Sequence, residues 1–88
     1  MRYKFAKDID VILEKEGGVV YNESNEKFFG VDFIGAIICE QIQNGVDTDD
    51  IIQLISGQYK TDIDTITTDV NEFVELLLKN SLIEIEGD

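Results

Sequence analysis

Residues Ile63 to Asn80 read IDTITTDVNEFVELLLKN and form the longest stretch of the chain with one hydrophobic period. Apolar side chains recur there at intervals of three and four residues, which places them on one face of a helix. Neighbouring apolar residues widen this face to roughly 200°, about twice the stripe of an ordinary surface helix. The pattern predicts a helix over about residues 64–80 that contacts either two parts of one core, or the core on one edge and a partner on the other. The apolar residues are Ile66, Val70, Phe73, Val74, Leu76, Leu77 and Leu78.

The composition of the chain indicates one small folded domain. Of its 88 residues, 43% are hydrophobic, a content that suits a globular core and is too high for a disordered segment. A single domain of this length, residues 1–88, buries only somewhat more than about 60% of its unfolded surface. The margin of stability is therefore expected to be thin.

The net charge of the chain excludes two classes of partner. The 19 acidic and 7 basic residues give a formal net charge of −12 at pH 7. Such a charge repels nucleic-acid phosphates and anionic lipid headgroups at long range. The first ten residues lack the apolar core of a signal peptide, and no stretch approaches the ~18 apolar residues of a membrane span. We therefore expect a cytoplasmic protein that binds neither nucleic acid nor membrane.

The residue types that carry most enzyme chemistry are scarce. The chain has no histidine, which excludes histidine-based triads and histidine-containing metal sites. Its single cysteine, Cys39, lies in an apolar helical pattern and is expected in the core. Asp49 and Asp50 fit the first turn of a helix better than a catalytic pair. The sequence thus predicts no catalytic residue, no metal site and no cofactor, and we do not expect an enzyme.

Residues 9–31 have the pattern of a three-stranded antiparallel meander. Apolar residues occupy alternate positions from Ile9 to Leu13, as in a strand with one buried face. Gly17-Gly18 is expected to supply positive φ angles for the first turn, and residues 22–25 (NESN) have side chains that bond their own backbone in the second. The third strand then has one paired edge and one edge that is open unless another segment covers it.

Two more helices are predicted between the meander and the long helix. The first covers about residues 33–43, with Asp32 as its N-cap and Asn44-Gly45 at its end. The second covers about residues 48–58 and has acidic side chains in its first turn. A last apolar run, residues 82–85, either adds a short strand or packs against the core. The expected class is α+β, a three-stranded meander followed by three helices.

Two alternative functions match parts of this pattern. Gly30-Val31-Asp32 before a helix is similar to the Gly-x-Asp-Ser of acyl carrier proteins, but Phe33 stands at the serine position, so phosphopantetheine cannot be attached. A winged helix regulatory or DNA-binding domain would read DNA with the helix at Ile63 to Asn80, whose acidic side chains repel phosphates. A mass gain with a phosphopantetheinyl transferase would support the carrier, and retardation of a DNA duplex at moderate salt would support the DNA binder.

Three stretches of the chain match the pattern of a known family. Residues 31–38 (VDFIGAII) are similar to a Leu-Asn-x-Thr-Gly-Ala-x-Ile run, and residues 47–51 (DTDDI) to a Thr-Val-Glu-Glu-Ile segment. Residues 69–83 keep the spacing of its Asp-Val, Phe-Leu, Leu and Gly-Leu-Val positions. By these matches the chain resembles the PqqD family, the peptide chaperones or RiPP recognition elements that bind leaders of ribosomally synthesised, modified peptides. The departures are Ile34 for threonine, Cys39 for tryptophan or leucine, and Ser81 for glycine.

The resemblance implies both an architecture and a function. It implies a winged helix-turn-helix-like bundle to which the leader of a precursor peptide adds as a further strand. The protein is then a non-catalytic adaptor of natural product biosynthesis, and its partners are the precursor peptide and a separate modifying enzyme, for example of the radical-SAM type. A free strand edge also allows a homodimer.

The peptide-binding site that the resemblance implies has two parts. The strand from Lys27 to Val31 supplies a main-chain ladder, and the long helix supplies an apolar wall. Of the two adjacent rings, Phe28 and Phe29, one is expected to face the core and the other the groove or solvent. Val70 and Leu77 also lie on the core stripe of the helix. The predicted peptide-binding residues are Lys27, Phe28, Phe29, Gly30, Val31, Val70, Val74, Leu77 and Leu78.

Overall fold

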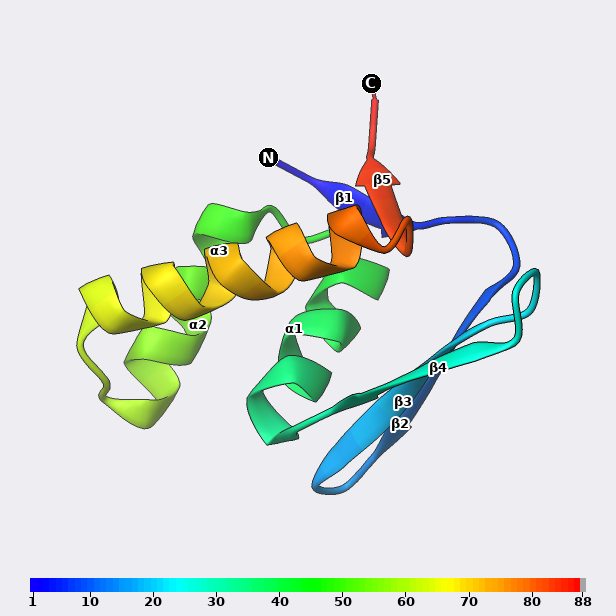
Figure 1. Cartoon of the computed structure of the whole chain (residues 1–88). Helices are drawn as coiled ribbons and strands as arrows, with labels where there is room; N and C mark the ends of the chain where they lie inside the picture. Colours follow the sequence, from blue (N-terminus) through cyan, green and yellow to red (C-terminus); the bar gives the residue numbers. More distant parts are fainter. Residues whose placement is uncertain (88) are drawn as a thin grey trace.

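The computed structural model describes residues 1–87 and has the predicted α+β architecture (Figure 1). The meander consists of β2 (Ile9–Glu14), β3 (Gly17–Asn22) and β4 (Lys27–Val31). The helices that follow it are α1 (Phe33–Gln43), α2 (Thr48–Tyr59) and α3 (Ile63–Lys79). Two short strands near the ends of the chain are β1 (Tyr3–Phe5) and β5 (Ile83–Ile85). The three-stranded meander and the three helices confirm the fold class expected from the sequence.

The meander forms an antiparallel sheet with the strand order β2-β3-β4. Val20 stands opposite Val11 on one side and Phe29 on the other, so these three side chains share one face. Helix α1 contacts all three strands, and Figure 1 shows the helices on one side of the sheet. Val20 is fully buried beneath them. The alternation of apolar residues therefore decides which face of the sheet meets the helices.

The first turn of the meander is shorter than the sequence predicts. Only Lys15 and Glu16 connect β2 to β3, while Gly17 and Gly18 lie inside β3. A Cβ atom on Gly17 would stand 2.6 Å from the carbonyl oxygen of Val31, and the φ angle of Gly17 is +157°. The positive φ expected of this pair is found at Gly17, but as the first residue of β3 and not within the turn. Gly17 is needed because the end of β4 approaches it closely.

Each of the first two helices begins at an aspartate that caps it. The Asp32 carboxylate accepts a hydrogen bond from the Gly35 N–H at 2.8 Å, and the Asp47 carboxylate accepts one from the Asp49 N–H at 2.9 Å. The α-amino group of Met1 also lies 2.7 Å from Asp47 Oδ2, and this contact lowers the pKa of the Asp47 carboxyl. The predicted starts of α1 and α2 are confirmed.

Strands β1 and β5 form a second, two-stranded antiparallel sheet. Lys4 stands opposite Glu84, and the charged ends of their side chains are 3.7 Å apart. Figure 1 shows the two strands side by side near the end of α3. Strand β1 was not predicted, because three residues are too few to show a hydrophobic period. A short strand was one of the two alternatives expected for residues 82–85, and β5 confirms it.

A single apolar core lies between the sheet and the helices. Cys39 is fully buried in it, and burial raises the pKa of its thiol to about 12, in agreement with the expected core position. No helix within residues 1–87 combines the length and the apolarity that crossing a bilayer requires. The largest fully buried side chains are those of Val20, Ile38, Cys39, Ile42, Ile51, Ile55, Val70, Leu77 and Leu82.

Candidate functional site

Strand β4 lies at an edge of the sheet and pairs only with β3. Along its other side, no strand of residues 1–87 pairs with it, because β5 at the end of the chain pairs with β1. Alternate main-chain groups of such an edge point outward and can bond to an added strand. The N–H of Lys27 already donates to Asn25 Oδ1 at 3.0 Å. The open part of the edge therefore runs from Phe28 to Val31.

A cavity of about 330 Å³ lies beside the end of β4, between the start of α1 and α3. A Cβ atom on Gly35 would stand 3.2 Å from Phe73 Cε1 and 3.2 Å from Val31 Cβ. Gly35 therefore allows the Phe73 ring to lie close to the end of β4. The cavity is lined by Asp32, Ile34, Gly35, Ile38, Ile66, Asp69 and Phe73.

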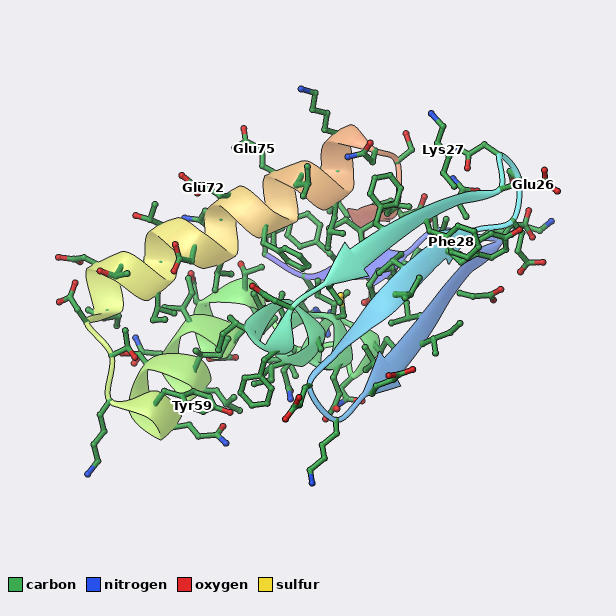
Figure 2. All side chains as sticks on the ribbon, turned by 60° about the horizontal axis from the view of Figure 1, so that its bottom comes forward. Glu26, Lys27, Phe28, Tyr59, Glu72 and Glu75 are labelled. Atoms are coloured by element: carbon green, nitrogen blue, oxygen red, sulfur yellow. The ribbon has the colours of Figure 1, made fainter. Side chains whose placement is uncertain are left out.

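The side of α3 that carries Phe73 extends along the helix. Asp69 lies four residues before Phe73 and Leu76 three residues after it, so all three share one side of α3. Phe73 is half-buried, whereas Leu76 is 50% exposed. Figure 2 shows Glu72 and Glu75 on the outer side of the helix. Phe73 and Leu76 thus form an apolar strip that starts at the cavity and has carboxylates along its margin.

The structure differs from the predicted apolar wall. Val70, Val74 and Leu77 are only 0%, 5% and 2% exposed, and their side chains belong to the core. Leu78 is 37% exposed, but it lies five residues from Phe73, which is about 140° around the helix. None of these four side chains lines the cavity. The packing places Phe73 at the cavity, whereas Leu76 and Leu78 both line a separate hollow on α3.

The two adjacent phenylalanines of β4 have different environments. Phe29 is half-buried and packs against the core, whereas Phe28 is 69% exposed. The Phe28 ring contacts the Tyr21 ring on β3, with 4.6 Å between the ring centroids. Figure 2 shows Lys27 and Phe28 leaving β4 on opposite sides. The expectation that only one of the two rings faces the core is confirmed.

The chemistry that this site offers is binding. The Asp32 and Asp69 carboxylates at the cavity are acidic, and Asp32 is already engaged with the N–H of Gly35. Among residues 1–87, no group of three histidine, cysteine, aspartate or glutamate side chains could hold a metal ion. In the same part of the chain, every buried side-chain nitrogen or oxygen has a hydrogen-bond partner. The site combines open main-chain groups, an apolar cavity and negative charge.

The sequence of the chain matches the model of one known protein family. The family model described as "Coenzyme PQQ synthesis protein D (PqqD)" matches residues 17–83. The chain belongs to the PqqD family. The match starts at β3 and ends in β5, so it includes the edge of β4 and the cavity between α1 and α3. A search of curated proteins gave no match.

Two solved structures have the same fold over almost the whole chain. One is described as "TbiB1 in Complex with the TbiA(beta) Leader Peptide"; it is 22% identical, with a TM-score of 0.86 over 97% of this chain and 99% of its own. The other is described as "Lasso peptide synthetase B1 complexed with the leader peptide"; it is 16% identical, with a TM-score of 0.86 over 97% of this chain and 100% of its own. At these identities the similarity establishes the fold.

Proposed function

We propose that this PqqD-family protein is a non-catalytic adaptor that binds the leader of a ribosomally synthesised precursor peptide and presents the remainder of that peptide to a separate modifying enzyme. By their descriptions, both similar structures are complexes with leader peptides. The observation that carries the proposal for this chain is the open edge of β4 beside the apolar cavity at Phe73.

In this proposal the leader adds to β4 as a fourth strand of the sheet. Its main chain bonds to the outward N–H and C=O groups between Phe28 and Val31, which provides affinity with little dependence on sequence. Every second side chain of a strand points to the same face. Alternate apolar side chains of the leader therefore reach the strip formed by Phe73 and Leu76, and the cavity selects for them.

In this proposal the adaptor raises the local concentration of the precursor's core peptide at the modifying enzyme. When it holds the leader and also contacts the modifying enzyme, the core of the peptide meets the enzyme at an effective concentration of order millimolar for a short flexible linker. This mechanism needs no catalytic group in the adaptor. A radical-SAM enzyme is one class of partner that the family resemblance suggests, and the reading frames beside this one are the place to identify both the precursor and the enzyme.

Hydrogen–deuterium exchange with and without a synthetic leader tests the proposed site. The peptides to test are leaders of any short precursors found in the neighbouring reading frames. We expect slower amide exchange from Phe28 to Val31, because the outward N–H groups become bonded, together with protection of α3 around Phe73. Protection confined to α2, or no protection at a saturating peptide concentration, would contradict the proposed site.

Point variants on α3 separate the apolar strip from the core. Leu76→Asp places a charge on the strip at a half-exposed position, so we expect leader affinity to fall by about tenfold or more while the fold is kept. Leu54→Asp on α2, where the leucine is 40% exposed, is the matched control and should leave affinity unchanged. Val74→Asp buries a charge at a 5% exposed position and should unfold the protein. Equal affinity of the Leu76 and Leu54 variants would remove α3 from the site.

A further inference from the structure

The face of the sheet that turns away from the helices has an apolar centre. A sheet with one face on the core usually carries polar side chains on the other face. Here, two rows of side chains cross the three strands on the outer face, as the register of the strands shows. One row is Ile12, Val19 and Gly30, and the other is Asp10, Tyr21 and Phe28.

Four of these side chains, Ile12, Val19, Tyr21 and Phe28, form what we call the outer patch. Ile12 is 53% exposed and Phe28 is 69% exposed, although neither is needed to fill the core. The rings of Tyr21 and Phe28 are paired, with 4.6 Å between their centroids. Clustered apolar exposure of this kind, on a sheet without a covering layer, is typical of an interaction surface.

A group of carboxylates borders the outer patch at Tyr21. The carboxyls of Asp10 and Glu23 lie close to each other, and this contact is the main reason why the pKa of Glu23 is raised. Asp8 is held beside them, because its carbonyl oxygen accepts a hydrogen bond from the Glu23 N–H at 2.9 Å. Like charges this close repel each other, and a cation brought between them relieves the repulsion.

We propose that the outer patch is the surface on which the modifying enzyme docks, through an apolar contact bordered by basic side chains of the enzyme. An arginine fits best at the border, because its guanidinium can stack on the Tyr21 and Phe28 rings while it bonds to the Asp10 and Glu23 carboxylates. The inference rests on the proposed function, since the partner is the enzyme to which the adaptor presents its peptide.

Charge and position favour the enzyme over other occupants of the outer patch. A second copy of the chain would bring two net charges of −12 together and set the two acidic borders against each other. The leader occupies the edge of β4 instead of the face of the sheet. The leader's side chains that point away from the helices then lie beside Phe28 and Gly30 on the outer face of the sheet. The enzyme therefore contacts a larger surface when the adaptor carries its peptide.

Photo-crosslinking in cells that produce the precursor and the enzyme tests this surface. We place p-benzoylphenylalanine at Ile12, on β2 and outside the proposed leader site, and in a second protein at Leu54 on α2 as a control of similar exposure. We expect the Ile12 variant to crosslink to the modifying enzyme at least about fivefold more than the Leu54 variant. Adding Asp10→Asn and Glu23→Gln should lower the yield. Crosslinking to the precursor, to a second copy or to an unrelated protein would overturn the proposal, as would equal yields at the two positions.

Binding measurements on purified proteins separate this inference from the proposed function. For Ile12→Glu, we expect the affinity for the enzyme to fall by about tenfold or more and the affinity for the leader to stay within about twofold. Loss of both affinities in a folded variant would argue against a separate docking surface. If the unaltered protein does not bind the leader, the proposed function is wrong. In that case the crosslink from Ile12 to the enzyme is the only test of the docking surface.

Discussion

Phe28 and Phe29 differ in exposure because successive side chains of a strand point to opposite faces of the sheet. The alternation places Phe29 with Val20 on the helix side, whereas Phe28 lies with Tyr21 on the outer side. The sequence is sufficient to predict that the two rings separate. It does not show that the outer ring meets Tyr21, because that contact depends on the register between β3 and β4.

At the scale of single residues, Glu23→Gln is expected to stabilise the protein at neutral pH. The folded-state pKa of Glu23 is raised above 4.5, chiefly by the contact with Asp10, so the folded chain holds this proton more tightly than the unfolded chain does. The stabilising protonation is complete below the unfolded pKa and is lost as the pH rises through the folded pKa. Glutamine carries no charge, so it removes the repulsion between this side chain and Asp10 at neutral pH.

Thermal unfolding at two pH values measures this effect. We expect the Glu23→Gln variant to have a higher Tm than the unaltered protein at pH 7, and the difference to shrink below pH 4. Glu16→Gln, in the first turn of the meander, is the control because it changes the net charge of −12 by the same amount. If both variants raise the Tm equally, the gain reflects net charge and not the contact with Asp10.

At the scale of elements, the join between β3 and β4 depends on Gly17. The Cβ atom of an alanine there would stand 2.6 Å from the main-chain oxygen of Val31, so a strand must move. We expect Gly17→Ala to lower the free energy of unfolding by about 1–3 kcal/mol. Urea denaturation measures this change.

Gly30 offers a matched control for Gly17. It lies in β4 itself, and a Cβ atom added there has no heavy atom within 4 Å. Gly30→Ala should therefore leave stability unchanged or raise it slightly, because alanine loses less conformational freedom on folding. Equal destabilisation by both substitutions would indicate a general requirement for glycine in the sheet, and would contradict the importance of the approach between Gly17 and Val31.

The long helix α3 shows how far the sequence predicts an element. Its period correctly gave the approximate ends of the helix and the burial of Ile66, Val70 and Leu77. Phe73 was expected on the same stripe but is only half-buried, whereas Val74, expected beside the stripe, is buried. Its apolar arc has edges on both sides of this stripe, and nothing in the period distinguishes them. The packing against α1 and the end of β4 places Phe73 at the cavity. The predicted wall therefore included Val74, which is buried in the core, and omitted Phe73, which lines the cavity.

At the scale of the whole molecule, the net charge of −12 is expected to steer basic peptides toward the site. Asp32 and Asp69 lie at the cavity, so a leader with lysine or arginine residues should associate more slowly as salt is added. The screening length falls from about 30 Å at 0.01 M to about 10 Å at 0.1 M ionic strength. Stopped-flow association at increasing sodium chloride concentrations measures this dependence.

A neutral peptide provides the control for the salt dependence. A leader whose basic residues are replaced by glutamine should associate at a rate that changes little with salt, because its remaining contacts are main-chain bonds and apolar burial. If the basic and the neutral leaders respond to salt in the same way, charge does not steer the encounter, whereas the proposed strand addition would be unaffected by that result.

The sequence was sufficient to predict the order and type of the main elements, the cap at Asp32 and the core position of Cys39. These features follow from local periods, local hydrogen bonds and composition, which the sequence contains directly. It also indicated a free edge on the third strand, and matched the pattern of the PqqD family.

Which surfaces are open became clear from the three-dimensional structure alone. It showed that β5 pairs with β1, so the edge of β4 stays free within residues 1–87, and it placed Phe73 of α3 at the cavity. It also aligned Ile12, Tyr21 and Phe28 on one exposed face. These outcomes depend on contacts between residues far apart in the chain. A local period fixes the face on which a side chain lies, but not the element that this face meets.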